Sequence, residues 1–284
     1  MKFKNNNGVY RFCGRVLALS AVCAALWCAA PETAAAEMRV TAGVERFSWG
    51  EYSGGVKMLD ESGPRYVAGF TWLRDGRSGL LLGYNGKLYS GDVTYNGRAC
   101  SASGQCSPFS TTTGYQGMLN EALLHYRLDS SIQPGDADRH YLDLVAGLGV
   151  DFWTRDIKKD GGVAGYKENY TIGFLRAGIA MLPAKSGLEA AAGFKYPLYL
   201  NEIVGFKALG ADDDPVLHPK ADISYYASVG WRFNNPWSVT LEFDSYRFKE
   251  SDPVTYTAGG VSAGAIVQPE SRMEVMTLKA GYSF

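Results

Sequence analysis

Apolar and polar residues alternate with a period of two along most of the chain after residue 39. This alternation is typical of β-strands, because successive side chains of a strand point to opposite faces of the sheet. Stretches rich in glycine, proline, asparagine and aspartate separate the alternating segments. The pattern predicts ten strands, over residues 40–52, 66–73, 79–95, 115–128, 141–155, 170–182, 188–201, 224–233, 237–248 and 272–284.

The last of these segments keeps its alternation up to the terminal carboxylate. Met276, Leu278, Ala280, Tyr282 and Phe284 alternate with small or polar residues. An apolar strand left at the edge of a sheet would pair with other chains, and a closed barrel avoids this by pairing its last strand with its first. The terminal segment therefore favours a closed barrel over an open sheet.

The connections between the predicted strands are long and short in turn. Long ones are expected at residues 53–64, around Cys100 and Cys106, and at 156–162, 202–222 and 251–270, and short ones at 74–77, 129–138, 183–187 and 234–236. Transmembrane barrels have this asymmetry, with short periplasmic turns and long outer loops. Ten strands fit the 248 residues from 37 to 284 best, with eight and twelve as alternatives. A soluble lipocalin-like barrel or a sandwich explains these features less completely.

The terminal strand carries a family resemblance as well. With Phe284 at the end and Tyr282 two residues before it, the strand resembles the last strand of bacterial outer-membrane β-barrels. The mature chain as a whole resembles the broad OmpA-like and porin-like superfamily. The resemblance implies an all-β, transmembrane, antiparallel up-and-down barrel of a Gram-negative cell. It further implies that the assembly machinery recognises the strand ending at Phe284, and that outer-membrane lipid and lipopolysaccharide surround the barrel, which we expect to be a monomer.

The first 36 residues have the order of a secretory signal peptide. Lys2, Lys4, Arg11 and Arg15 precede an apolar run over residues 16–30, and small residues up to Ala36 suit a cleavage site. The run is shorter than the ~20 residues that a spanning helix needs. We therefore predict a signal peptide at 1–36, an outer-membrane β-barrel domain at 37–284, and export to the cell outer membrane.

The charge and the cysteines of residues 37–284 narrow the possible partners. Of the chain's 28 basic and 29 acidic residues, 24 and 28 remain after residue 36, so the mature chain is mildly acidic. Nucleic-acid binding requires a basic surface, and we expect no such partner. Cys100 and Cys106 are the cysteines that remain, and an even pair in an exported chain predicts a disulfide in one loop. Two thiolates alone cannot complete a zinc site.

Two groups of side chains are expected at fixed places in such a barrel. Large aromatic residues near strand ends would form girdles at the two membrane interfaces, namely Trp72, Tyr84, Tyr126, Phe152, Tyr196, Trp231, Trp237 and Tyr282. Charged residues of the inward face would form a plug of paired charges or, alternatively, a narrow path for ions or protons. These are Glu121, His125, Arg127, Asp143, Asp151, Arg176, Glu189, Lys195, Arg232, Glu242, Asp244 and Lys279.

Candidate catalytic residues are few. The histidines are His125, His140 and His218. Omptin proteases, which also have ten strands, need an Asp-x-His and an Asp-x-Asp pattern near the outer rim. Asp136-Ala137-Asp138 is on the predicted inner side, and Asp212-Asp213-Asp214 lacks a matching histidine base. Barrel lipases, acyltransferases and lipid A deacylases pair a histidine with a serine on the barrel wall. No serine has matching spacing along the strand of His125, and a pair formed across strands stays open.

We therefore expect no catalytic, cofactor-binding or metal site. The three acids at 212–214 read as a solvated turn, with a calcium site as the open alternative. The expected function is that of a non-enzymatic outer-membrane barrel with a charge-packed lumen, whose five long surface loops serve interaction or envelope integrity. A narrow channel for ions or small solutes is the alternative, and an outer-membrane enzyme, lipid A modifying or omptin-like, is the second alternative.

Overall fold

A computed structural model describes residues 36–74, 79–100, 105–128 and 140–284. Residues Glu37–Phe284 form one compact unit, and its main sheet closes into a ten-stranded antiparallel barrel. No helix among the described residues is long and apolar enough to cross a bilayer. The barrel strands are β1 Ala36–Ser53, β2 Val56–Arg74, β3 Gly79–Cys100, β4 Cys106–Arg127, β5 His140–Ile157, β6 Tyr166–Pro183, β7 Gly187–Val204, β10 Ser224–Arg232, β11 Trp237–Lys249 and β14 Glu270–Ser283.

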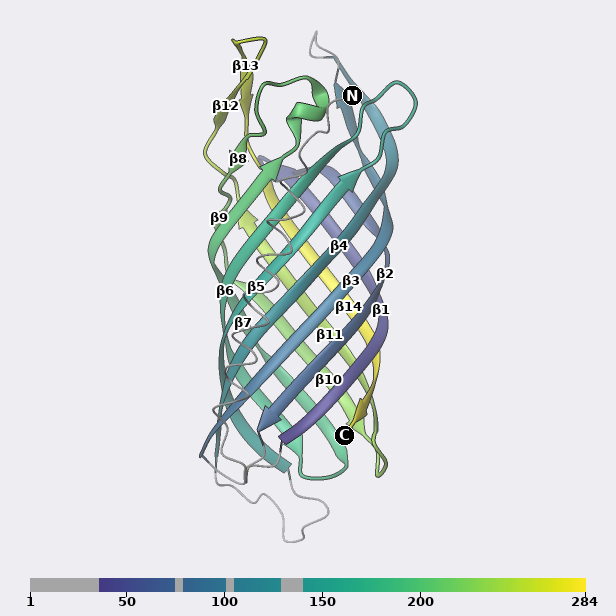
Figure 1. The fold of residues 1–284 in the computed structure, drawn as a ribbon, viewed down its shortest axis with the longest axis vertical. Coiled ribbons are helices and arrows are strands. Elements are labelled where there is room, and N and C mark those ends of the chain that lie inside the picture. Colours follow the sequence, from purple (N-terminus) through teal and green to yellow (C-terminus); the bar gives the residue numbers. More distant parts are fainter. Residues whose placement is uncertain (1–35, 75–78, 101–104, 129–139) are drawn as a thin grey trace, which may run out of the picture. The chain divides into compact units, whose positions relative to one another are not determined.

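Two pairings between distant segments close the barrel. β14 pairs with β1 in a register that runs from Arg39 opposite Ser283 to Tyr52 opposite Glu270. β7 pairs with β10 across the long connection between them. The remaining strands pair with their neighbours in sequence, as in an up-and-down barrel (Figure 1). The prediction that the last strand closes on the first is confirmed.

The two ends of the barrel differ in their connections. β1 begins and β14 ends at one end, which we call the terminal end (Figure 1). Short turns join β6 to β7 and β10 to β11 there. The opposite end, which we call the loop end, carries the connections from β7 to β10 and from β11 to β14. The predicted turn at residues 74–77 and connection at 129–138 lie largely or wholly outside the described residues.

The predicted long loop at residues 53–64 is wrong. β1 continues to Ser53 and β2 begins at Val56, so only Gly54 and Gly55 form the turn. Both glycines have positive φ, 56° and 80°, which only glycine adopts readily and which suits a two-residue hairpin. The glycine, proline and charges that suggested a loop are tolerated, because the strands pair on both sides and Leu59 and Glu61 are buried inside the barrel.

β3 and β4 are also longer than predicted, for the same reason. Their ladder runs without interruption from Gly79 opposite Arg127 to Cys100 opposite Cys106. The register places the two cysteines opposite each other at the end of the hairpin, where residues 101–104 of the five that join them lie outside the described part of the chain. The disulfide between them stays a prediction.

The two longest connections contain regular structure that the sequence pattern did not predict. Residues 202–222 include a 3-10 helix, η1 Phe206–Leu209, and short strands β8 Val216–Leu217 and β9 Lys220–Ala221. Residues 251–270 include the hairpin of β12 Val254–Ala258 and β13 Val261–Ile266, a two-stranded sheet separate from the barrel. The Phe206 ring contacts Tyr256 of this hairpin with 5.1 Å between ring centroids, so the two connections pack together.

Candidate functional site in the barrel lumen

The outward face of the barrel is apolar in a continuous belt. Leucine, valine and aromatic side chains are strongly exposed on every barrel strand, with Leu80 and Leu148 each 60% exposed. Beyond the belt towards the loop end, the outward positions become polar, for example Asp92, Gln116, Thr154 and Lys167. An apolar belt of this kind is the surface that lipid hydrocarbon covers in transmembrane barrels. All chemistry of the barrel proper must therefore lie on the inward face.

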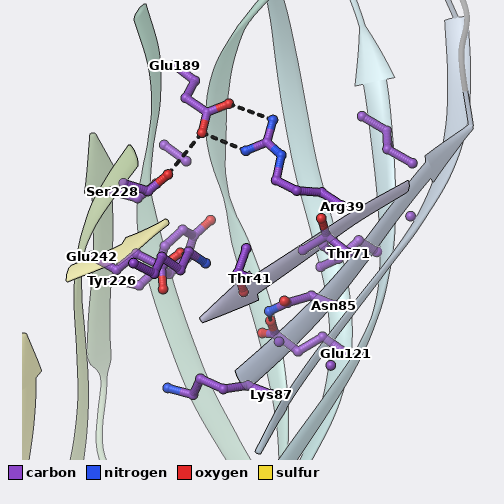
Figure 2. Close-up of a pocket in the computed structure, with 18 of the residues that line it drawn as sticks. Arg39, Thr41, Thr71, Asn85, Lys87, Glu121, Glu189, Tyr226, Ser228 and Glu242 are labelled. Carbon is purple, nitrogen blue, oxygen red and sulfur yellow. Dashed lines mark hydrogen bonds and ion pairs between the residues drawn. The ribbon is translucent and has the colours of Figure 1, made fainter. Parts of the chain in front are cut away.

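A cavity of about 240 Å³ occupies the terminal half of the lumen (Figure 2). At its mouth the Arg39 guanidinium donates to both Glu189 oxygens at 2.8 and 3.1 Å. Arg232 donates to Glu37 at 2.9 Å and to Glu189 at 3.3 Å, and the Thr240 hydroxyl completes the shell at 3.1 Å. The two guanidiniums and two carboxylates neutralise each other around the opening.

Further ion pairs line the cavity wall. Arg176 donates to Glu121 at 2.9 and 3.0 Å, and the Asn85 amide donates to the same carboxylate at 2.6 Å. Figure 2 shows Asn85 and Glu121 side by side beneath Thr41. Other pairs are Lys87 with Glu45, Lys195 with Asp244, and Lys279 with Glu242. Burying a charge costs far less free energy when it is paired with an opposite charge. The charges of this wall therefore compensate one another.

A layer of stacked cations and aromatic rings lies on the side of the cavity that is nearer the loop end. Arg65 donates to Glu45 at 2.7 and 3.0 Å, and its guanidinium lies over Phe47 and Tyr89 at 4.2 and 4.4 Å from the ring centroids. The Tyr89 hydroxyl donates in turn to Asp151 at 2.8 Å. Burial behind these rings strengthens each ion pair, because water that would screen it is excluded.

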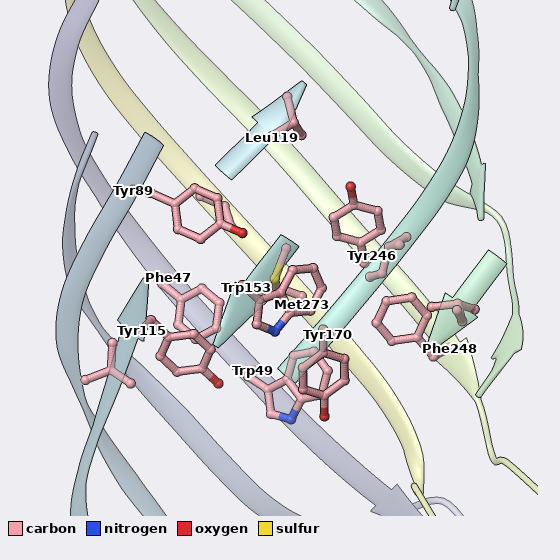
Figure 3. Close-up of a cluster of buried hydrophobic side chains, with 14 of the residues drawn as sticks. Phe47, Trp49, Tyr89, Tyr115, Leu119, Trp153, Tyr170, Tyr246, Phe248 and Met273 are labelled. Atoms are coloured by element: carbon pink, nitrogen blue, oxygen red, sulfur yellow. The ribbon is translucent and has the colours of Figure 1, made fainter. Parts of the chain in front are cut away.

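The middle of the lumen is filled by a cluster of buried aromatic side chains (Figure 3). Trp153 stacks on Tyr170 with 4.9 Å between centroids, and Trp49 packs edge-on against Tyr170 at 5.8 Å. Each ring is at most 3% exposed, and each buried aromatic side chain contributes about 1.5–3 kcal/mol. We call the set the aromatic plug: Phe47, Trp49, Tyr115, Trp153, Tyr170, Phe174, Tyr246 and Phe248.

A second charged cluster lies beyond the aromatic plug, towards the loop end. Arg155 is buried and donates to three carboxylates, those of Glu51 at 2.9 Å, Glu61 at 3.1 and 3.2 Å, and Glu168 at 2.7 Å. Glu202 of β7 is fully buried beside them. We call Arg155 and these four acids the glutamate cluster.

The charged residues predicted to face inward all do so. Glu121, His125, Arg127, Asp143, Asp151, Glu189 and Lys195 are buried, and the others are half-buried members of the pairs above. Sequence reasoning missed further charges on the same face: Arg39, Glu45, Glu51, Glu61, Arg65, Lys87, Arg155, Glu168 and Glu202. Glu61 and Glu202 lie in segments that the alternation predicts as loops, and Arg65 and Glu168 lie just outside the predicted strands.

The aromatic plug was also missed, although the parity of its residues signalled it. Trp153 lies between Asp151 and Arg155 on one face of β5, and Trp49 lies two residues before Glu51 on β1. A large ring that shares the face of buried charges must point into the lumen. By contrast, the aromatic residues predicted for the girdles are on the outward face, and Tyr126, Trp231 and Trp237 are each more than 50% exposed.

The histidines and the acidic triplet do not come together. His125 contacts Asp143 at 3.2 Å beside Arg127, and His218 bonds the Leu200 carbonyl at 2.9 Å. One Asp-x-His does occur in the sequence, at Asp138-Arg139-His140; its histidine begins β5 at the terminal end, and its other two residues lie outside the described part of the chain. Among the described residues no three acidic, histidine or cysteine side chains are placed to hold a metal ion.

The acidic triplet instead anchors loops. The Asp212 carboxylate accepts from the N–H groups of Gly259 and Gly260 at the tip of the β12–β13 hairpin, at 3.0 and 2.9 Å. Asp214 accepts from the Lys207 N–H at 2.8 Å.

No protein-family model and no curated protein sequence matches the chain. Bacterial outer-membrane barrels are among the solved structures that match the chain. They include the outer membrane protease OmpT of Escherichia coli, at 12% identity over 88% of this chain and 96% of that chain, with a TM-score of 0.49. The transport unit of the autotransporter AIDA-I of Escherichia coli matches at 11% identity over 90% and 92%, with a TM-score of 0.43. The translocator domain of NalP from Neisseria meningitidis matches at 12% identity over 98% of both chains, with a TM-score of 0.39. Because these identities and TM-scores are low, the assignment of the fold rests on the strand pairing of this chain.

Proposed function

We propose that the chain is a non-enzymatic barrel of the bacterial outer membrane, with a lumen closed to ion flow, that works through its outer hairpins and loops. The apolar belt supports the membrane position, because soluble proteins rarely expose contiguous apolar surface of this extent. β1 begins and β14 ends at the terminal end of the barrel. In transmembrane barrels the end that holds both chain termini faces the periplasm, so the loop end faces the outside of the cell.

The single observation that carries the closed lumen is the aromatic plug. Its rings come from β1, β4, β5, β6 and β11, which lie on different sides of the barrel, and they pack into one buried cluster. Ion pairs lie on both sides of the plug. Barrels of eight to ten strands are narrow enough for side chains to fill, whereas aqueous channels need about sixteen strands.

Planar-bilayer recording tests the closed lumen. The purified barrel should give no conductance steps above background, whereas a variant with Trp49→Ala and Trp153→Ala should give steps, because two indoles are removed from the plug. A variant with Leu80→Ala and Leu148→Ala, on the outward face, should remain silent. Steady single-channel steps from the unaltered protein would overturn the proposal in favour of a narrow channel.

The interaction role belongs to the parts of the chain beyond the belt. These are the extended ends of the β1–β2 and β3–β4 hairpins, the connection that holds η1, and the β12–β13 hairpin. Deleting residues 254–266 should leave the barrel folded, because β12 and β13 form their own sheet. Loss of surface binding or of envelope integrity is expected, and a deletion that leaves every such property intact would contradict an interaction role for this hairpin.

The non-enzymatic part of the proposal rests on the lumen chemistry. His125 is held by Asp143 next to Arg127, a pairing that serves charge compensation. Overexpression should therefore leave lipid A and the peptide profile of the cell unchanged. A shift in lipid A mass or new cleavage of surface peptides would count against it.

A further inference from the structure

The terminal half of the lumen keeps an open cavity of about 240 Å³ (Figure 2). A cavity that holds a single water needs about 10–15 Å³. The space is therefore large enough to admit a small organic molecule. The aromatic plug lies between the cavity and the loop end, so in a lumen closed by the plug a guest enters from the terminal end, past Arg39 and Glu189.

The cavity exists because one wall of the barrel carries short inward side chains. At this level β2 contributes Gly69 and Thr71, and β3 contributes Gly83 and Asn85. Side chains normally fill a barrel of this width, and these four leave part of it empty. Figure 2 shows Thr71 and Asn85 on one side of the space and Glu242 on the other. A guest in the cavity therefore lies between the short wall of β2 and β3 and the charged wall of β11.

The charges of the cavity wall balance. Five basic and five acidic side chains line the cavity. The strands around it carry exposed apolar residues on their outward face, for example Leu82 next to Gly83 and Leu241 next to Glu242, so this part of the lumen lies within the apolar belt. A further net charge would stay uncompensated there, at a high cost in free energy. A guest without net charge suits these surroundings.

Two carboxylates of β11 have oxygens to spare. Asp244 pairs with Lys195 through Oδ1, and Glu242 pairs with Lys279 through Oε1. The second oxygen of each carboxylate accepts no hydrogen bond from the described residues. Both side chains line the cavity and keep 25% and 28% of their surface exposed, so they can accept hydrogen bonds from a guest.

Two ammonium groups of the wall have hydrogens to spare. A lysine ammonium has three donors. Lys87 of β3 donates one to Glu45 at 2.9 Å, and Lys279 of β14 pairs with Glu242. β3 and β11 lie on opposite sides of the barrel, with three strands between them one way round and five the other way. Spare charged donors and spare charged acceptors therefore meet the same space from different walls.

We propose that this cavity binds a small zwitterion of the amino-acid type, with its ammonium group between Glu242 and Asp244 and its carboxylate at Lys87. Both ends of the guest then make hydrogen bonds between charged groups, which are roughly twice as strong as neutral ones. Exclusion of water from the lumen strengthens them further. The net charge of the wall stays unchanged. A neutral polyol of the same size offers no charge to these groups and binds more weakly.

The rest of the wall suits an aliphatic side chain. Val67, Leu119 and Leu123 line the cavity beside the short residues of β2 and β3. Apolar side chains of the guest gain free energy when these residues remove them from water. Leucine combines the charge pattern with such a side chain and is therefore the probe of choice.

The site is separate from the proposed role of the outer hairpins and loops. In a closed lumen the guest enters and leaves at the same end, so the cavity is a binding site and no path. Binding to the purified barrel does not depend on which end faces the cell exterior or on whether the lumen conducts. A failure of the binding experiment therefore leaves the proposed function untouched, and the reverse holds as well.

Isothermal titration calorimetry of the unaltered barrel in detergent micelles compares three ligands of similar shape. Leucine carries both charges, isocaproate lacks the ammonium group, and isoamylamine lacks the carboxylate. Leucine should bind saturably, and each of the others about tenfold more weakly or worse, because a hydrogen bond between charged groups is lost. The absence of saturable leucine binding would overturn the proposal. So would an affinity for either of the other ligands that equals the affinity for leucine.

Gly83→Leu tests the location of the site. A Cβ atom at this position would lie 3.4 Å from Leu123 Cβ and 3.5 Å from His125 Nε2, which are ordinary contacts, so the variant should fold while its side chain fills the cavity. Leucine binding should be lost. Ala146→Leu, on the outward face of β5, is the control and should bind like the unaltered barrel. Unchanged leucine binding by a Gly83→Leu barrel with heat-modifiable migration on gels would overturn the assignment to this cavity.

Glu242→Gln tests the orientation of the guest. The variant removes a charge from the ammonium end and leaves Lys87 in place, so leucine should bind about tenfold more weakly, by the loss of one charged hydrogen bond. The weak binding of isocaproate, which has no ammonium group, should not decrease. An equal loss for both ligands would overturn the assigned orientation.

Discussion

At the scale of single residues, the inward face of this barrel combines two ways of filling a lumen. Charged side chains satisfy one another in pairs near both ends, as Arg39 does with Glu189 and Arg155 with Glu61. Between them the rings of the aromatic plug exclude water from the centre. The plug and the ion pairs depend on each other, because the Arg65 guanidinium lies over the Phe47 ring while it bonds Glu45.

The contribution of the plug can be measured at Trp49. This side chain is 1% exposed and packs against Trp153, Tyr170 and Phe248. Trp49→Ala should lower the free energy of unfolding by about 3–5 kcal/mol, the usual cost of removing a buried aromatic ring. Urea unfolding in detergent micelles measures it. Val40→Ala, on the outward face of the same strand, is the control, and an equal loss in both variants would contradict the importance of the plug.

Parity along the strands allowed the charges of the inward face to be predicted, but not their partners. Asp143, Asp151 and Trp153 have the same parity on one strand, so their shared face follows from the sequence alone. That Arg155 bonds Glu51, Glu61 and Glu168 depends on how three other strands are staggered against β5. Stagger is set by all the pairings around the barrel together, and no local pattern encodes it.

At the scale of elements, polar segments proved to be strands where a partner strand was present. Residues 53–64 combine glycines, a proline and charges, yet all but the two turn glycines belong to β1 or β2, which are paired neighbours in the sheet. Local propensity is a weak guide in sheets, because cross-strand hydrogen bonds and side-chain contacts decide the outcome.

The β12–β13 hairpin gives a prediction at this scale. Backbone N–H groups, that of Gly260 foremost, lower the pKa of Asp212, which accepts from the hairpin tip. The anchoring is therefore fully present above the ordinary aspartate pKa of about 3.9 and is lost as the pH falls through the lower pKa of folded Asp212. Hydrogen exchange at Gly259 and Gly260 should accelerate on acidification in the unaltered barrel.

Asp212→Asn supplies the test of that anchor. Its amide oxygen can still accept one hydrogen bond, so protection should be weaker than in the unaltered barrel and independent of pH. Asp213→Asn is the matched control, because the Asp213 side chain is 82% exposed and lies 3.8 Å from the Lys207 amine. If acidification leaves the exchange rates of Gly259 and Gly260 unchanged in the unaltered barrel, the anchor has no role.

At the scale of the whole molecule, closure depends on the last strand. β14 pairs on one side with β1 and on the other with β11, so it completes the ring of strands. Phe284 is 73% exposed on the outside, where its ring contacts Tyr282 at 5.1 Å, and its N–H donates to the Met38 carbonyl at 2.9 Å.

Replacing the terminal aromatic residue should therefore impair assembly. Phe284→Asp places a charge on the lipid-facing surface next to Tyr282, and we expect lower surface levels and loss of heat-modifiable migration on gels. Phe284→Tyr keeps an aromatic ring and should behave like the unaltered protein. Normal surface levels and normal heat-modifiable migration of Phe284→Asp would refute the assignment of this strand.

The sequence by itself determined the number of barrel strands, the closure of the last strand on the first, and the parity that separates the apolar exterior from the charged interior. These follow from the period of two, a local property of each segment. The tertiary structure alone decided that the outer hairpins extend as strands, that aromatic rings gather inside the lumen, and that Arg155 meets three glutamates of other strands. Each of these is a contact between segments far apart in the chain, fixed only when all ten strands are staggered around one axis.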